Sequence, residues 1–287
     1  MILRLRKLLE KTLGFTLVRK RPPFQLDLYE RLYSRERLAE KPFYNVGAGS
    51  FWHPYWTNLD YLADWYTGEQ RDIIHLDLMA LGPLPIEPGS AEILYTSHTI
   101  EHVTEEAVRN LFCEALRVLK PGGIFRVITP DAETAFAAMM RGDKDWFYWD
   151  EYYSSPAQFS QQWSAPPASA PLEERWLNLL ASQMAPLSTS ASLVKYHAAE
   201  IRKIVAEKGF IGSLDFFTGQ CSFNPERPGN HISWWTHEKV MRYLQDAGFR
   251  TVGRSGYGQS SSPLMRRSEQ FDHLHPQMSL YVEAVKD

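Results

Sequence analysis

Two glycines and an acid near the start of the chain could together bind a nucleotide-like ligand. Gly47, Ala48 and Gly49 directly follow a short apolar segment that is expected to be a strand. Glycine lets the backbone approach a ligand closely and leaves its N–H groups available. Asp60 stands 11 residues after Gly49, where a carboxylate can accept hydrogen bonds from both hydroxyls of a ribose. That spacing is shorter than the roughly 20 residues of the dinucleotide fingerprint, and its third glycine is missing, so the pattern disfavours an NAD site.

A second group of residues could do metal chemistry. His98, Glu101 and His102 match the inverted zinc-protease pattern His-x-x-Glu-His, which needs its ligands on one helix and a further protein ligand. Here the motif stands between an expected strand and a helix expected to begin after Thr104. One interpretation is a metal-dependent enzyme that uses these three residues. The other, which we favour, is a hydrogen-bonded turn that supports a pocket, and we therefore expect no metal site.

The alternation of strand and helix patterns determines where these side chains meet. Apolar segments predict strands at 43–46, 57–61, 72–76, 93–96, 124–129, 251–254 and 279–285. Helical spacing predicts helices at 26–40, from Thr104 to a stop at Pro121, at 172–184, at 191–208 with a stop at Gly209, and from Thr236 to Gly248. This pattern predicts an α/β fold with a doubly wound seven-stranded sheet, a helical insertion at 131–235 and an N-terminal helical extension. Ligands bind at the carboxyl ends of the strands in such sheets.

These segments, taken in order, resemble class I S-adenosylmethionine-dependent methyltransferases, and in particular the bacterial group associated with surface-glycan biosynthesis. The motifs that carry the resemblance are Gly47 to Gly49, Trp56 to Asp60, Asp77-Leu78, Glu101-His102, Arg117 to Gly123, Pro130-Asp131, His231, Ala247 to Phe249 and Ser279 to Glu283. The resemblance covers residues 43–131 and 231–286. Ala48 stands where many members have Cys or Ser.

The resemblance implies a Rossmann-like fold, S-adenosylmethionine as cofactor and a role for each matching residue. The residues that would contact the cofactor are Gly47, Ala48 and Gly49 at its methionine part, Asp60 at its ribose, Asp77 and Leu78 at its adenine, and Thr96, Ser97 and His98 below its sulfonium. For Asp77 a helix cap is the alternative. The implied domains are a basic arm with a helical extension at 1–40, the cofactor-binding domain at 41–130 and 236–287, and a substrate cap at 131–235.

The expected reaction is O-methylation of a glycan or glycan precursor. The sulfonium already favours transfer, so alignment and the exclusion of water contribute most. A base with a pKa near neutral pH helps a sugar hydroxyl to react, and histidine suits that role. The candidates are His98 and His231, with His102 behind them; a structural hydrogen bond is the alternative for His231. The aromatic cluster at 146–153 could stack on sugar faces or belong to the core.

Composition sets further bounds. The net charge of −3 provides no global basic field, so we expect no nucleic-acid partner. The two cysteines exclude a disulfide framework and favour a reducing, cytoplasmic location, with Cys113 expected to be buried in a helix. The basic segment 1–21 is either a packing arm or an amphipathic helix peripheral to the inner membrane. If that arm is the working surface, a non-catalytic binding or scaffold protein on the same fold is a further alternative.

Overall fold

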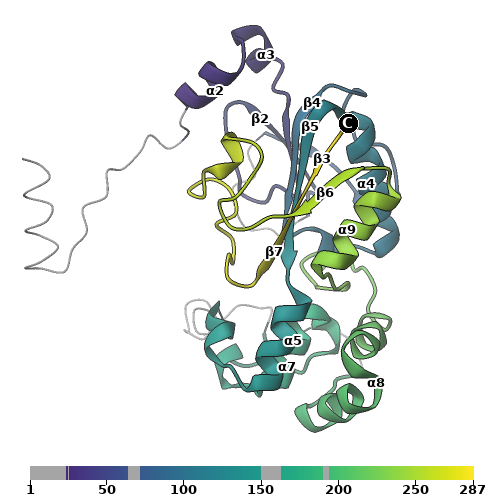
Figure 1. The fold of residues 1–287 in the computed structure, drawn as a ribbon. Helices are drawn as coiled ribbons and strands as arrows, with labels where there is room; N and C mark the ends of the chain where they lie inside the picture. Colours follow the sequence, from purple (N-terminus) through teal and green to yellow (C-terminus); the bar gives the residue numbers. More distant parts are fainter. Residues whose placement is uncertain (1–23, 25, 64–71, 150–162, 190–193) are drawn as a thin grey trace, which may run out of the picture.

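The computed structural model describes residues 24, 26–63, 72–149, 163–189 and 194–287, and they form one sheet with helices around it (Figure 1). The strands are β1 Phe43–Val46, β2 Trp56–Asp60, β3 Ile73–His75, β4 Ala91–Ser97, β5 Leu119–Pro130, β6 Thr251–Arg254 and β7 Ser279–Val285. They lie in the order β3-β2-β1-β4-β5-β7-β6 in a seven-stranded sheet. Strands β1 to β5 pair in parallel, whereas β7 runs antiparallel to both β5 and β6. The predicted doubly wound, Rossmann-like α/β fold is confirmed.

Helices cover both faces of the sheet and also form a group beyond its carboxyl edge. The α-helices are α2 Leu26–Leu32, α3 Arg35–Ala39, α4 Glu105–Val118, α5 Ala132–Arg141, α7 Leu172–Leu180, α8 Ala198–Thr218 and α9 His237–Asp246. Short 3₁₀ turns are η1 Leu78–Ala80, η2 Ile100–His102, η3 Asp145–Phe147, η4 Pro167–Ser169, η5 Ser182–Met184 and η6 Leu264–Arg266. Helices α4 and α9 pack on one face, and α2, α3 and the segment before β7 lie on the other (Figure 1).

Local chemistry explains where α4 and α9 begin. The hydroxyl of Thr104 accepts a hydrogen bond from the N–H of Ala107 at 3.3 Å, and Thr236 does the same for Lys239 at 3.2 Å. Both side chains satisfy N–H groups that have no partner within the helix. The apolar stripe of α4 faces the sheet and leaves Cys113 exposed on the other side. The expectation that Cys113 is buried was therefore wrong.

Other element boundaries differ from the expected ones for backbone reasons. The expected helix at 26–40 is two helices, because Ser34 adopts an extended conformation and caps the second one. Helix α4 ends at Val118, before Pro121, and β5 begins there instead of at residue 124. The expected stop at Gly209 is a kink, because its φ of +69° interrupts α8 and a helix resumes beyond it.

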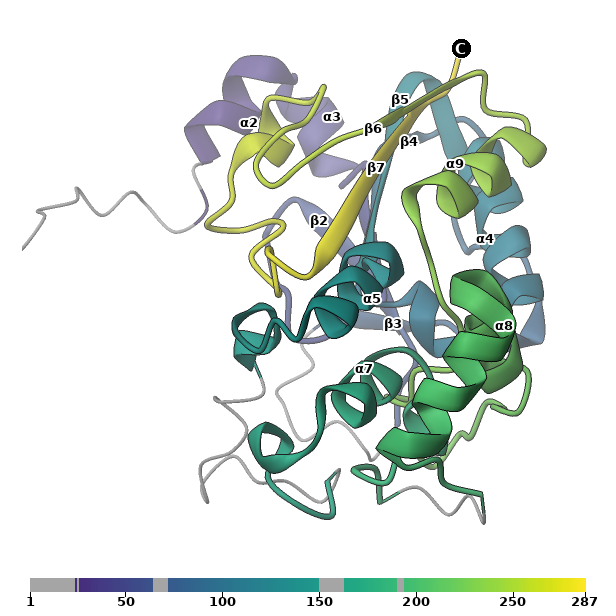
Figure 2. The same cartoon turned by 60° about the horizontal axis from the view of Figure 1, so that its bottom comes forward.

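The helices between β5 and α9 have a hydrophobic cluster of their own beyond the end of the sheet (Figure 2). The cluster joins α5, α7 and α8 through buried residues such as Trp176, Ile201 and Phe217. The segment that holds these helices starts and ends at adjacent points, where Ala132 donates its N–H to the carbonyl of Trp235 at 3.0 Å. We call residues 131–235 the insertion segment; the boundaries of the domains themselves stay a prediction.

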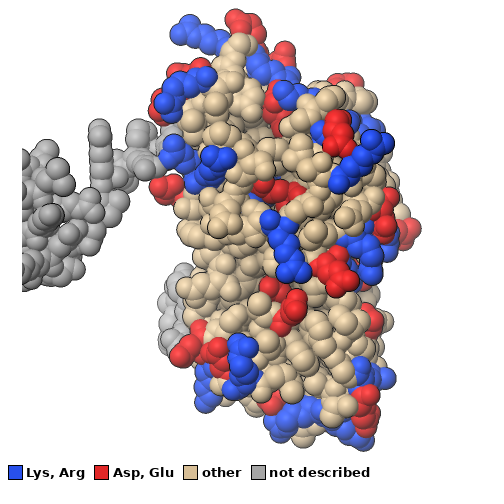
Figure 3. All heavy atoms as spheres, viewed as in Figure 1, with Lys and Arg blue, Asp and Glu red and all other residues tan. Residues whose placement is uncertain are grey.

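The next observations concern the expected membrane contact and the expected lack of a nucleic-acid partner. Among the described residues, no helix has both the length and the apolar character needed to cross a bilayer. The basic arm at 1–21 lies outside the described residues. On the face drawn in Figure 3, the Lys and Arg side chains of the described residues are interspersed with Asp and Glu side chains and do not gather in one stripe.

Candidate active site

A cavity of about 840 Å³ lies at the carboxyl ends of the parallel strands. Loops that follow β1, β2, β3 and β4 line it, together with the insertion segment and the segment before β7. The predicted residues among its lining are Gly47, Ala48, Gly49, Asp60, Asp77, Leu78, Ser97, His98, His102 and His231. Thr96 is not among the lining residues, because its position in β4 turns its side chain into the protein, where it is 0% exposed.

The glycine loop after β1 has a backbone conformation that other residues rarely adopt. Gly47 has a φ of +71° and Gly49 a φ of +55°. A Cβ atom on Gly47 would lie 2.0 Å from the side-chain oxygen of Thr99, whereas a Cβ on Gly49 would meet nothing within 4 Å. Gly47 is therefore required both for its conformation and for the close approach of the loop after β4. Thr99 had no signal in the sequence that marked it as this partner.

Asp60 ends β2 and is tied to the glycine loop. Its Oδ2 accepts the N–H of Gly49 and its Oδ1 accepts the N–H of Tyr61, each at 2.7 Å. Burial raises the pKa of Asp60 above its usual value, although these two N–H groups act in the opposite direction. Each oxygen of a carboxylate has room for two hydrogen bonds, so one position on each remains for a ligand.

Asp77 caps a short turn, as its alternative interpretation proposed. Its Oδ1 accepts the N–H of Met79 at 2.9 Å at the start of η1. Asp77 and Leu78 nevertheless both line the cavity. A carboxylate oxygen that is not used in the cap can still face a ligand.

Glu101 is the central acid of the cavity floor and is only 2% exposed. Its Oε2 accepts the hydroxyl of Thr129 at 3.0 Å. Its Oε1 lies 3.2 Å from Nδ1 of His98, but it has no hydrogen bond of acceptable geometry among the described residues. Burial alone would raise the pKa of Glu101; the neighbouring imidazoles of His98 and His102 outweigh burial and lower it to about 2.

His98 is hydrogen-bonded at Nε2, and its Nδ1 faces Glu101. Its backbone φ of +52° turns the side chain toward β7, where Nε2 lies 2.8 Å from the hydroxyl oxygen of Ser279. Ser279 donates its only hydroxyl proton to the carbonyl of His275 at 2.8 Å, so Nε2 of His98 is the donor in the first bond. His98 therefore connects the loop after β4 to the start of β7.

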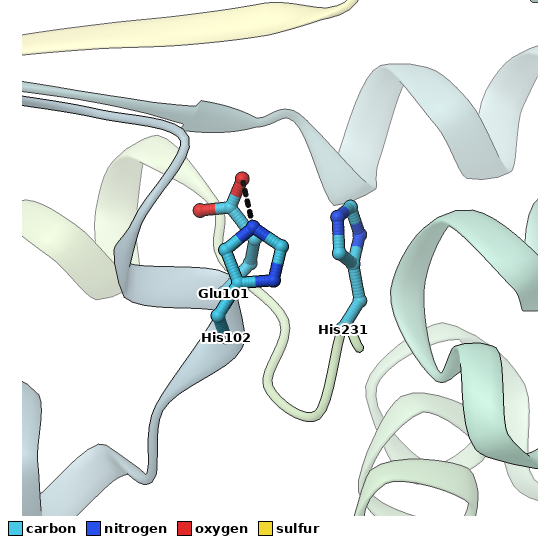
Figure 4. Close-up of side chains that lie close together, drawn as sticks. All are labelled: Glu101, His102 and His231. Atoms are coloured by element: carbon cyan, nitrogen blue, oxygen red, sulfur yellow. Dashed lines mark ion pairs between the residues drawn. The ribbon is translucent and has the colours of Figure 1, made fainter. Parts of the chain in front are cut away.

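His102 and His231 come from distant parts of the chain and face each other with ring centroids 4.7 Å apart (Figure 4). Nδ1 of His102 lies 3.2 Å from the carbonyl oxygen of Asn230, and Nδ1 of His231 is hydrogen-bonded to the carbonyl oxygen of Leu179. Because a carbonyl only accepts, both Nδ1 atoms carry protons. Removal from water and the nearby imidazole of His102 lower the pKa of His231 to about 4, so His231 is neutral at neutral pH.

Several lining residues lie outside the predicted set. His275 reaches the cavity from the segment before β7, and its ring lies 3.9 Å from that of Trp149 between centroids. Helix α7 adds Arg175 and Asn178. The predicted aromatic cluster contributes Trp149 and Phe147, while its residues from 150 onward lie outside the described part of the chain. No local pattern in the sequence pointed to the segment before β7.

Comparison with known proteins supports the interpretation of these loops. Residues 57–127 match the model of a family described as a methyltransferase domain. No curated protein matches the chain.

Three solved structures to which the chain is similar are described as S-adenosylmethionine-dependent methyltransferases. One from Mesorhizobium loti is 16% identical, with 85% of this chain and 90% of that one covered and a TM-score of 0.37. One from Archaeoglobus fulgidus is 11% identical, with 91% and 100% covered and a TM-score of 0.38. One from Thermotoga maritima is 11% identical, with 92% and 96% covered and a TM-score of 0.36. The cofactor assignment rests on the family model and on the geometry of the loops.

The match of residues 57–127 to a methyltransferase domain implies S-adenosylmethionine as cofactor, and the cavity fits it. The missing side chain at Gly47 admits Thr99, whereas the space beside Gly49 is open to a ligand. The buried Oδ1 of Asn45, which lines the same cavity, has no hydrogen-bond partner among the described residues. Asp60 keeps one acceptor position on each oxygen, as a ribose with two adjacent hydroxyls requires.

Proposed function

We propose that this chain is an S-adenosylmethionine-dependent methyltransferase that methylates a hydroxyl oxygen of a glycan or glycan precursor. The observation that carries the proposal is that one cavity collects the glycine loop, Asp60, three histidines and the aromatic side chains of the insertion segment. The family match over residues 57–127 supports the cofactor part of the proposal. The side chains of the insertion segment support the acceptor part.

The loops at the end of the sheet would hold the cofactor. S-adenosylmethionine supplies, when bound, a methyl group on a positively charged sulfur that is already activated for transfer. Gly47 and Gly49 would let the backbone approach the methionine part, and Asp60 would accept hydrogen bonds from the ribose hydroxyls. Asp77 and Leu78 would flank the adenine. The protein then contributes by holding the acceptor oxygen in line and by excluding water.

A histidine would take the proton of the acceptor hydroxyl. His102 and His231 both carry a proton on Nδ1, which in a neutral ring leaves Nε2 as an acceptor. Burial lowers the pKa of His231 to about 4, which keeps its Nε2 unprotonated at neutral pH but makes it a weaker base than an ordinary histidine. His98 is held at Nε2 by Ser279, its Nδ1 lies 3.2 Å from Oε1 of Glu101, and it acts as a positioning residue for Glu101.

The acceptor would lie against the insertion segment. Among the described residues of that segment, four aromatic side chains line the cavity, and they are Phe147, Trp149, Trp163 and Phe223. An aromatic ring offers a flat apolar surface to the C–H face of a sugar. Asn178 and Asn230 line the same region with amide groups that can bind sugar hydroxyls. Arg175 and Arg227 of the same segment also line the cavity, so its aromatic walls stand beside polar and charged groups that can bind the hydroxyls of a glycan.

Calorimetric titration with S-adenosylhomocysteine tests the cofactor site. The wild-type protein should bind one equivalent, and Asp60→Ala should bind none at the same concentrations. Asp246→Ala is the matched control, because Asp246 is an exposed acid at the end of α9 and its side chain is 56% exposed. The absence of binding by the folded wild-type protein would reject the methyltransferase proposal.

Transfer of a labelled methyl group tests the acceptor. Purified glycan precursors should become labelled by the wild-type protein and not by His231→Gln, which should still bind S-adenosylhomocysteine. If other hydroxyl compounds are labelled but no glycan is, the proposed methyltransferase activity stands and the proposal that the acceptor is a glycan is rejected.

A further inference from the structure

Glu101, His102 and His231 bring three potential metal ligands together (Figure 4). One ligand atom from each lies within 4.8 Å of the others, and Nε2 of His102 is 3.9 Å from Oε1 of Glu101. In a tetrahedral site with ligands about 2.1 Å from a zinc ion, two ligand atoms are about 3.4 Å apart, so these side chains must move closer together by up to about 1.4 Å to bind one ion.

The hydrogen bonds around the two histidines prepare them as ligands. Each Nδ1 donates to a backbone carbonyl, that of Asn230 for His102 and that of Leu179 for His231. This fixes the tautomer in which Nε2 carries a lone pair, and it is the outer-shell arrangement that metal-binding histidines usually have. His98 is not in this group of ligand atoms within 4.8 Å of one another, although its Nδ1 lies 3.2 Å from Oε1 of Glu101.

Glu101 provides an observation in favour of a bound ion that is independent of the hydrogen bonds of the histidines. Its carboxylate is buried, and Oε1 has no hydrogen bond of acceptable geometry among the described residues although it points toward His102. A lone pair on His102 facing a carboxylate oxygen is repulsive unless a proton or a cation lies between them. A cation satisfies all three ligand atoms at once, whereas a proton satisfies one pair.

We propose that Glu101, His102 and His231 bind one divalent first-row transition-metal ion of the zinc class. Two imidazole nitrogens and one carboxylate oxygen suit such an ion better than magnesium or calcium, which prefer oxygen ligands. Three protein ligands leave a coordination position open to a water molecule or an acceptor hydroxyl, whose deprotonation the ion favours. The ion would occupy the nitrogens assigned above to proton acceptance and would take over that part of their role.

The position of the ligands also gives the ion a structural consequence. Glu101 and His102 belong to η2 after β4, whereas His231 lies near the end of the insertion segment. The backbone carbonyl of Glu101 already accepts the N–H groups of Ile232 and Ser233, at 2.8 and 3.2 Å. The ion would add a further link between the loop after β4 and the insertion segment, so binding should raise the melting temperature.

The test uses the full-length protein after treatment with a chelator and removal of the chelator. Titration with Co2+ should give a visible absorption band that saturates at one equivalent, and Zn2+ should displace it. Calorimetric titration with Zn2+ should give the same stoichiometry. Thermal denaturation with Zn2+ bound should give a higher melting temperature than without it. The absence of saturable binding by the folded wild-type protein would overturn the proposal without any variant.

Three variants locate the ion. Glu101→Gln and His231→Gln keep the side-chain size and should weaken binding by more than roughly 100-fold, which exceeds the effect of losing an outer-shell partner. His197→Ala is the matched control, because His197 and Glu174 form another His–Glu pair, at 3.3 Å, on the surface of the insertion segment. Far-ultraviolet circular dichroism shows whether each variant folds. Unchanged binding in a folded Glu101→Gln, or equal loss in the control, would overturn the assignment.

The inference does not depend on the proposed methyl transfer. Metal titrations are done without the cofactor, and S-adenosylhomocysteine titrations are done with a chelator present. Metal binding without S-adenosylhomocysteine binding would reject only the proposed function. The reverse result would reject only the metal site and would leave His231 as a base.

Discussion

The N–H of Gly49 donates a 2.7 Å hydrogen bond to Oδ2 of Asp60, which joins the glycine loop to the end of β2. Asp60→Asn should therefore disturb both the loop and the ligand contacts, because the amide NH2 that replaces one carboxylate oxygen is a donor and would face another donor. A hydrogen bond to a charged group contributes about 1.5–3 kcal/mol, so binding of S-adenosylhomocysteine should weaken by about ten- to a hundredfold. Calorimetry measures the change, and unaltered affinity would show that Asp60 does not contact the cofactor.

The two glycines of this loop should differ in their tolerance of a side chain. Gly47→Ala places a Cβ 2.0 Å from the oxygen of Thr99, so the loop must move, and both stability and cofactor binding should be lost in large part. Gly49→Ala meets no atom within 4 Å and should cost only the conformational strain of its positive φ, about 1–2 kcal/mol. Thermal denaturation and S-adenosylhomocysteine titration of both variants check the contrast; equal effects would contradict it.

His53 should make stability depend on pH. Nε2 of His53 donates to the carbonyl of Phe24 at 3.1 Å, and Nδ1 accepts the N–H of Tyr55 at 3.2 Å. Burial lowers the pKa of His53 from 6.5 to about 4, so below pH 6.5 the unfolded chain takes up a proton before the folded one does. The stability from the neutral ring is present above pH 6.5 and is lost as the pH falls toward 4, by on the order of 3 kcal/mol.

His53→Gln is the variant that isolates this effect. Glutamine keeps one donor and one acceptor but does not titrate. Urea denaturation at several pH values between 7 and 4 should show that the unfolding free energy of the wild-type protein falls more steeply than that of the variant. Parallel curves would assign the acid sensitivity to other groups.

Arg126 is fully buried between two acids, and its loss should destabilise the fold strongly. Its Nε lies 3.1 Å from Asp272 and its Nη1 lies 2.9 Å from Glu283, with 0% of its side chain exposed. Arg126→Met would leave both carboxylates without their partner and should cost about 3–5 kcal/mol. Arg202→Met, which breaks an ion pair with Glu173 in which the arginine is 62% exposed, should cost less than about 1 kcal/mol. Urea denaturation compares them, and similar losses would contradict the argument.

Local patterns predicted the parts of the molecule that local chemistry determines. Strand β1 has the predicted bounds, and Thr104 and Thr236 cap their helices as expected. The apolar stripe of α4 also predicts that Cys113 is exposed, because Cys113 lies on the other side of the helix. The wrong expectation was based on the residue type and ignored the position of Cys113 around the helix. These features depend on residues within a few positions of one another.

The contacts that complete the candidate site depend on distant parts of the chain. The approach of His231 to His102 follows from the return of the insertion segment to the sheet, and the sequence contains no periodic signal for it. His275 reaches the cavity from a segment without regular strands or helices. The local pattern at Asp77 allowed two interpretations. Only the hydrogen bond from the N–H of Met79 to Oδ1 of Asp77 shows that Asp77 caps a turn.

The bond between the N–H of Ala132 and the carbonyl of Trp235 brings the two ends of a long stretch of chain to one point. Because its two ends are adjacent, this stretch can be treated as an exchangeable cassette. We expect that its length or sequence can change while the register of the strands stays the same. Chimaeras that join residue 131 to residue 236 through a stretch from another protein should keep the sheet. The architecture thus lets evolution vary the cassette independently of the sheet.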